Sequence, residues 1–79
     1  MKPQDLYLMF TRWSEEDSAY IGHCPDLFPF GGVCHGATPV EAFTKLCEIV
    51  EDTVLTANQQ GIPLPSANTR PMRELESVA

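Results

Sequence analysis

The order of apolar and polar positions predicts short strands at the start of the chain. Residues 6–13 contain β-branched, aromatic and long apolar side chains and neither Gly nor Pro, which predicts a strand. Both faces of this strand are apolar, because Leu8 and Phe10 fall on one face and Tyr7 and Trp13 on the other. We therefore expect the strand to lie inside a sheet with its second face covered, for example by a second copy of the protein.

Two further strands follow from the next stretch of sequence. The polar residues 14–18 are typical of a hairpin turn, and residues 19–24 are predicted to form the antiparallel return strand. Pro25 ends that strand because it cannot donate a ladder hydrogen bond. After an apolar loop over residues 27–32, residues 33–35 are predicted to form a short third strand.

The clearest local signal marks the start of a helix. Thr38 can accept a hydrogen bond from the amide of Glu41, and Glu41 can reach back to the amide of Thr38. Pro39 suits the first helical position, where its missing N–H costs nothing. The helix should end one or two residues before Gly61, which is the residue type preferred just past a helix end.

One apolar stripe follows helical spacing within this segment and should face the sheet. Its predicted members are Phe43, Leu46, Cys47, Val50, Val54 and Ala57. Leu55 falls outside the stripe among polar neighbours, and Ile49 lies at its margin. Both are candidates for an exposed contact, although isolated apolar residues are common on protein surfaces.

These elements predict an α+β fold, with a three-stranded antiparallel sheet and one long helix in a domain over residues 1–65. Residues 66–79 form a tail, in which residues 72–78 are a candidate for a short fourth strand that would complete the domain. A chain of 79 residues suits one domain with a small core. Such domains often depend on disulfides, metals or oligomerisation for stability.

Charge disfavours nucleic acid as a direct ligand. The chain carries 11 acidic and 5 basic residues, with a formal net charge of −6, and its basic residues are scattered. A duplex-binding surface needs clustered Lys or Arg to replace counterions. An acidic module instead suits a basic protein partner.

The sequence also indicates the compartment. The first residues lack the apolar segment of a signal peptide, and no apolar run is long enough to span a bilayer. Three cysteines, an odd number, favour free thiols in a reducing cytoplasm. We therefore expect a cytoplasmic protein without a membrane segment.

Two His–Cys pairs raise the question of a metal or a catalytic site. His23, Cys24, Cys34 and His35 are all zinc-type ligands on two neighbouring predicted strands. Adjacent strand residues point to opposite faces, however, so one pair cannot easily bind the same ion. We favour packed thiols and solvent-facing imidazoles over a metal site, and a Cys–His nucleophile lacks an identifiable orienting residue. Whether Cys24 and Cys34 form a disulfide depends on geometry alone.

Several large apolar side chains are candidates for a partner or self interface, because interface cores are enriched in aromatic residues. Packing within the domain is the alternative interpretation. The candidates are Tyr7, Trp13, Tyr20, Phe28, Phe30 and Leu55.

Three ordered motifs together resemble the HicB-like antitoxin family. Residues 13–27 read WSEEDSAYIGHCPDL, an acidic turn, an aromatic strand and a Pro-Asp-Leu corner. Residues 35–42, HGATPVEA, are similar to the family's helix start, and residues 61–65, GIPLP, to its helix exit. The resemblance covers roughly residues 6–65.

This resemblance implies a partial RNase H-like fold of β-β-β-α-β order, a homo-oligomer, and an antitoxin that blocks a small basic, HicA-like ribonuclease toxin by direct contact. Because only residues 66–79 follow the helix exit, a DNA-binding segment of the kind many members carry is not expected. We expect no enzymatic activity, cofactor or metal. The acidic residues 15–17 are more simply a solvated hairpin tip than a two-metal nuclease site. An orphan oligomeric scaffold or ligand-binding domain without a toxin is the alternative function.

Overall fold

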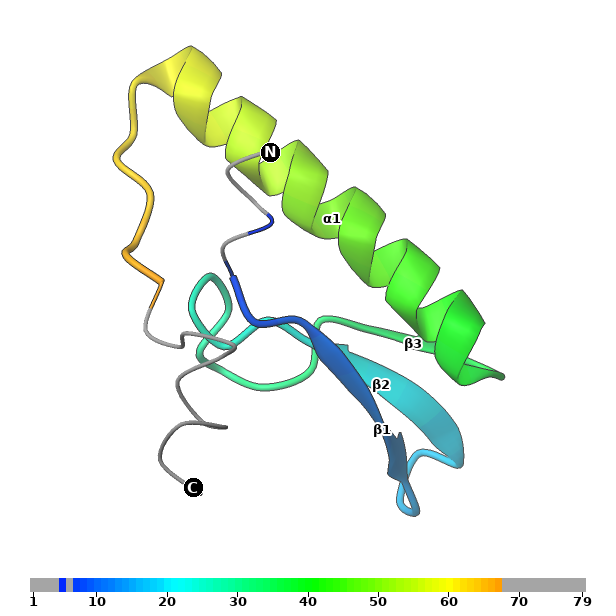
Figure 1. The fold of residues 1–79 in the computed structure, drawn as a ribbon. Helices are drawn as coiled ribbons and strands as arrows, with labels where there is room; N and C mark the ends of the chain where they lie inside the picture. The colour runs from blue at the N-terminus through cyan, green and yellow to red at the C-terminus, as the bar shows by residue number, and fades with distance from the viewer. Residues whose placement is uncertain (1–4, 6, 68–79) are drawn as a thin grey trace, which may run out of the picture.

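The computed structural model of the chain describes Asp5 and residues 7–67 and has the predicted α+β fold (Figure 1). A three-stranded antiparallel sheet is formed by β1 (Phe10–Ser14), β2 (Ala19–His23) and β3 (Cys34–Gly36) in that order. The helix α1 (Pro39–Gln60) follows and crosses one face of the sheet. The candidate fourth strand at residues 72–78 lies outside the described residues.

The first strand begins later than predicted. Its pairing with β2 starts where Phe10 lies opposite His23, and residues 7–9 are not part of the strand. The start of β1 is set by its partner strand, because β2 ends at His23. The chain then turns, with the amide of Leu27 donating to the carbonyl of Cys24, so residues 7–9 have no strand beside them. The prediction of a strand over residues 6–13 was therefore wrong at its N-terminal end.

The hairpin between β1 and β2 is closed by side-chain hydrogen bonds within its acidic turn. The Ser14 hydroxyl donates to Asp17 Oδ2 at 2.8 Å, and the Asp17 amide donates to Ser14 Oγ at 3.3 Å. Ser18 takes a left-handed conformation with φ of 51°. The turn thus holds its three carboxylate residues, 15–17, at the tip of the hairpin.

Both predicted ends of α1 are confirmed. Thr38 Oγ1 accepts from the Glu41 amide at 3.1 Å, Pro39 occupies the first turn, and Gly61 has a φ of 68° that suits a residue without a side chain. One detail differs from the prediction. Glu41 Oε2 accepts from the amide of Ala37 at 3.2 Å, one residue before the expected Thr38 amide.

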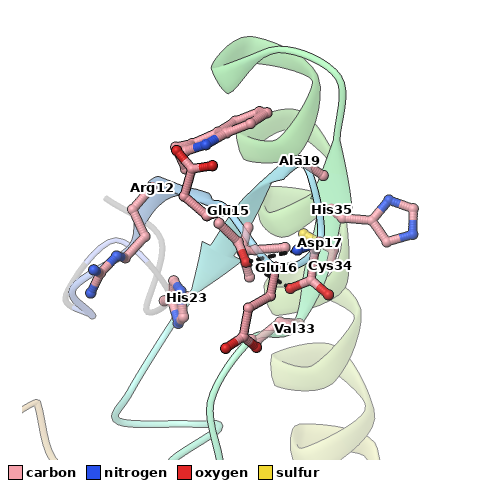
Figure 2. Close-up of a pocket in the computed structure, with 13 residues that line it drawn as sticks. Arg12, Glu15, Glu16, Asp17, Ala19, His23, Val33, Cys34 and His35 are labelled. Atoms are coloured by element: carbon pink, nitrogen blue, oxygen red, sulfur yellow. Dashed lines mark hydrogen bonds between the residues drawn. The ribbon is translucent and has the colours of Figure 1, made fainter.

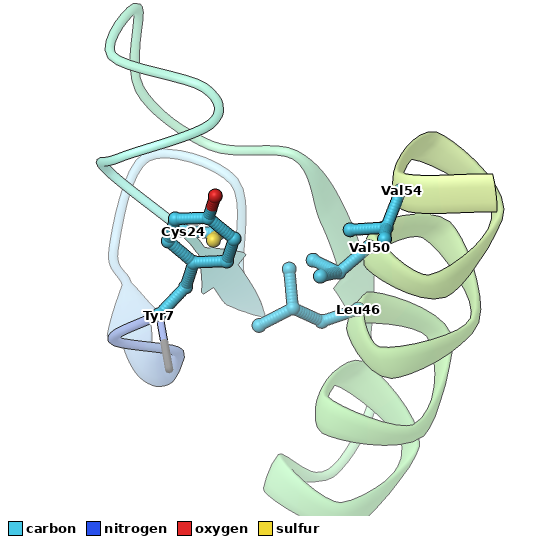
Figure 3. Packing of buried hydrophobic residues seen from close by; sticks show 5 residues of the cluster. All are labelled: Tyr7, Cys24, Leu46, Val50 and Val54. Carbon is cyan, nitrogen blue, oxygen red and sulfur yellow. The ribbon is translucent and has the colours of Figure 1, made fainter. Parts of the chain in front are cut away.

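The core lies between the sheet and α1 and also takes in the segment before β1 (Figure 3). Its buried residues are Tyr7, Cys24, Leu46, Val50 and Val54. Partly buried side chains pack around them: Met9, Leu27, Phe28, Val33, Cys34 and Leu64. Segments from both ends of the described chain therefore contribute to one core.

The helix approaches the sheet closely at Gly22 and Gly36. As a result, the helix residues that are buried differ from the predicted apolar stripe. A Cβ atom on Gly36 would lie 2.6 Å from the Ala42 nitrogen, so only a small helix residue fits over this point. Ala42 is accordingly fully buried, whereas Phe43 is 39% exposed. Phe43 shares a helical face with Val50 and Val54 but lies near the start of the helix and keeps part of its surface exposed, so the prediction that it belongs to the buried stripe was wrong.

Candidate protein-binding surfaces

The face of the sheet that α1 does not cover is one candidate surface. Gly22 and Gly36 point at the helix, as their contacts with Leu46 and Ala42 show. Their strand neighbours Ile21 and His35 must therefore point to the opposite side, and Arg12, which pairs with Ile21, does the same. We call this side the open sheet face; it carries Phe10, Arg12, Ile21, His23 and His35.

A shallow hollow of about 1050 Å³ lies on the open sheet face (Figure 2). Ile21 and the acidic turn residues 15–17 are among the residues that line it. In Figure 2 the side chains of Arg12 and His23 lie to one side of the acidic turn and that of His35 to the other. The hollow therefore combines apolar side chains with groups of both charge signs.

The floor of the open sheet face is built from packed side chains. The rings of Phe10 and His23 stack at 15° with centroids 4.9 Å apart. Gly32 lies so close over Ile21 that a Cβ atom there would come within 2.5 Å of Ile21 Cγ2. This packing fixes the positions of Ile21 and of the Phe10–His23 pair on the open sheet face, and Gly32 covers part of Ile21.

The outer face of α1 is a second candidate surface. Glu48, Asp52 and Leu55 follow one another at helical spacing, and all three are exposed, Leu55 by 52%. Lys45 lies on the same side but is engaged near the helix start. Its Nζ lies 3.4 Å from Glu41 Oε1 and donates to the carbonyl of His35 at 3.1 Å. We call Glu48, Asp52 and Leu55 the outer helix face.

Electrostatics around the helix start favours a charged carboxylate at Glu41. The Ala37 amide, followed by the Lys45 ammonium, lowers the pKa of Glu41 below its ordinary value. Glu41 therefore stays ionised at neutral pH and holds Lys45 at the helix start. Glu48 and Asp52 of the outer helix face lie about two and three helical turns beyond Glu41.

The predicted interface residues are distributed over several parts of the molecule. Trp13 is 45% exposed and packs edge-on against Tyr20, with centroids 5.2 Å apart, on the helix side of the sheet. Phe30 is 99% exposed, whereas Phe28 is half-buried against the core. These aromatic side chains do not form one continuous patch with Leu55 of the outer helix face.

Tyr7 belongs to the core. It is only 8% exposed, and its hydroxyl donates to the carbonyl of Pro65. Burial, together with the negative charge of Asp26, raises the pKa of the Tyr7 hydroxyl. In this conformation Tyr7 is a packing residue and offers no surface to a partner.

The cysteines and histidines point apart, as strand geometry predicts. Cys24 is completely buried, while its neighbour His23 stacks on Phe10 at the open sheet face. The Cys34 thiol donates to the carbonyl of Ala42 at 3.3 Å under the helix, and all three cysteines are free. Within residues 5 and 7–67, no three His, Cys, Asp or Glu side chains are grouped to hold a metal ion.

Sequence reasoning did not single out Arg12 and Ile21, although both are central to the open sheet face. The alternation of Ala19, Ile21 and His23 along β2 was a usable signal, because residues two apart share a face.

In the part of the chain that the structure describes, no helix has the length and apolar character needed to cross a membrane. Comparison with known protein families, curated proteins and solved structures finds no match to this chain.

Proposed function

We propose that this chain is an antitoxin-type binding module that acts in the cytoplasm and neutralises a small basic ribonuclease by direct contact. The observation that carries the proposal is the outer helix face, where Leu55 is exposed about one turn beyond Asp52 and two turns beyond Glu48. An apolar anchor beside charged residues is a common arrangement at protein interfaces.

Charge supports a basic protein as the partner. Among the described residues the basic side chains are Arg12 and Lys45, and Lys45 is held by Glu41 and the carbonyl of His35. The outer helix face therefore has a negative potential, which speeds encounter with a basic partner and disfavours acidic ones. Leu55 then supplies apolar area next to these carboxylates.

The resemblance to the HicB-like antitoxins supports the choice of a ribonuclease as partner. Its three motifs fall at the acidic hairpin with β2, at the capped start of α1 and at the helix exit after Gly61. The toxin would be HicA-like, small and basic.

The mechanism follows from competition for the same charges. A ribonuclease binds RNA phosphates through Lys and Arg side chains. Carboxylates such as Glu48 and Asp52 would pair with those side chains, and Leu55 would contact an apolar spot beside them. Neutralisation in this scheme needs no catalysis by the antitoxin, and binding weakens as salt is added.

The experiment uses the full chain and the small basic protein encoded next to its gene. We expect the two proteins to copurify and RNA cleavage to stop in the complex. Replacing Glu48→Lys and Asp52→Lys together should weaken binding at least about tenfold. The matched control is Glu15→Lys with Glu16→Lys, which makes the same change in net charge on the hairpin tip and should have a smaller effect.

The proposal is overturned if the pair forms no complex and RNA cleavage continues. It is also overturned if the hairpin control weakens binding as much as the helix variant does, because long-range charge alone would then explain the interaction. RNA or DNA cleavage by the purified chain with magnesium or manganese would identify a nuclease instead.

A second candidate function is an orphan oligomeric scaffold, and the open sheet face favours it. Such a protein would form a stable assembly and would have no toxin encoded beside it. Inspection of the neighbouring reading frame separates the two functions directly.

A further inference from the structure

We propose that the open sheet face is the docking site for a second copy of this chain, with the strands of the two copies antiparallel across the interface. The acidic hairpin tip of each copy then lies over Arg12 of the other. This inference concerns a different surface from the outer helix face and does not depend on the existence of a toxin.

The two faces of the sheet are unequally covered. Helix α1 buries the side that carries Gly22 and Gly36, whereas Phe10 and Ile21 on the other side are only partly covered. Leu8, between the inward-facing Tyr7 and Met9, is 41% exposed. A domain of this size has a small core, so burying a second apolar layer adds substantially to its stability.

Positive and negative charges lie at separate places on the open sheet face. Arg12 lies in the middle of β1, and the carboxylates of residues 15–17 lie beyond its end at the hairpin tip. A strongly basic partner would be repelled at Arg12, and a nucleic acid would be repelled at the tip. A surface that carries both signs at separate places is instead complementary to a reversed copy of itself.

Symmetry selects the orientation. If the two copies stacked with parallel strands, the two hairpin tips would meet and six carboxylates would crowd together. If the strands run antiparallel about a two-fold axis that passes between Arg12 and the hairpin tip, each tip lies over Arg12 of the other copy. Opposite charges then face each other on both sides of a two-fold axis.

Pairing of two β1 edges is a competing way to form a dimer. It would extend the sheet, but a pairing centred on Arg12 would place two like charges directly opposite each other. Charged side chains on an edge strand also commonly oppose such pairing. In the face-to-face arrangement Arg12 lies opposite acidic residues of the other copy. In the edge pairing centred on Arg12 it lies opposite the Arg12 of the other copy.

The test is sedimentation equilibrium of the full chain and of charge variants, with circular dichroism to confirm folding. We expect a dimer whose dissociation constant rises with salt. Arg12→Glu should weaken it at least about tenfold, and Glu15→Arg with Glu16→Arg should do the same. Combining all three substitutions should restore dissociation to within about threefold of the original value, because each contact then has its signs exchanged.

Glu48→Arg with Asp52→Arg is the control, since it makes the same charge change as the hairpin variant on the outer helix face and should leave the dimer intact. Ile21→Glu should dissociate the dimer irrespective of salt. The proposal is overturned if the chain is monomeric, or if the dimer resists the single charge reversals. It is equally overturned if the combined variant fails to recover, or if Arg12→Glu weakens only the binding of a toxin.

Discussion

Gly22 lies directly under Leu46, so that a Cβ atom on Gly22 would come within 3.2 Å of Leu46 Cβ. The same atom would lie 2.8 Å from the sulfur of Cys34. The close approach of sheet and helix therefore depends on the absence of a side chain here. We expect Gly22→Ala to reduce the free energy of unfolding by about 1–3 kcal/mol, measured by urea denaturation.

The comparison that tests this explanation is Gly36→Ala. At Gly36 the added atom would meet backbone, at 2.6 Å from the Ala42 nitrogen, whereas at Gly22 it meets side chains that can shift. Gly36→Ala should therefore cost more than Gly22→Ala. Equal stability of Gly22→Ala and the original chain would contradict the packing argument.

The cap of α1 provides a second prediction. Thr38→Ala removes the acceptor of the Glu41 amide and should reduce the free energy of unfolding by about 1 kcal/mol. Thr44→Ala is the matched control, because the Thr44 hydroxyl only donates back to the Val40 carbonyl within the helix. The control should be neutral or slightly stabilising by thermal or urea denaturation. Equal losses in both variants would refute a specific role for the cap.

Acidification provides a third prediction, through Glu41. Its pKa is lowered in the folded protein by the Ala37 amide and by Lys45, so its carboxylate favours the folded state above the unfolded pKa. That contribution is lost as the pH falls through the lower, folded pKa. In Glu41→Gln, urea midpoints should therefore fall less between pH 7 and pH 3 than in the original chain. A fall in Glu41→Gln as large as in the original chain would contradict this explanation.

Thiol reactivity provides a fourth prediction. Burial raises the pKa of the Cys24 thiol, and the side chain has no exposed surface, so the reactive thiolate is both rare and inaccessible. We expect iodoacetamide to modify Cys24 most slowly of the three cysteines in the native protein, by mass spectrometry. In urea the difference should disappear. Native labelling of Cys24 as fast as that of the half-buried Cys34 would show that the core opens readily.

The helix could be predicted from sequence because both of its ends carry local signals. Thr38, Pro39 and Glu41 specify the start and Gly61 the end without help from distant residues. The start of β1 could not be predicted in the same way. It depends on where β2 ends, which is a property of another segment.

The candidate surfaces were less accessible to sequence reasoning. Exposure of Leu55 was predicted, since its position relative to the helical stripe is a local property. Whether the second face of the sheet is covered depends on the packing of the whole domain, and no single residue determines it. Likewise, the burial of Ala42 depends on the close approach of the helix to Gly36, which the spacing of apolar residues along the helix does not reveal.

The hydrogen bond from Tyr7 to Pro65 joins residues 58 positions apart. Leu64, beside this bond, packs on the same core that Tyr7 enters before the first strand. The core therefore cannot be completed while the helix is still being synthesised on the ribosome, because Leu64 and Pro65 follow the helix in the sequence. We expect the domain to fold in a single step only after residues 64 and 65 have left the exit tunnel, and shorter nascent chains to remain sensitive to protease.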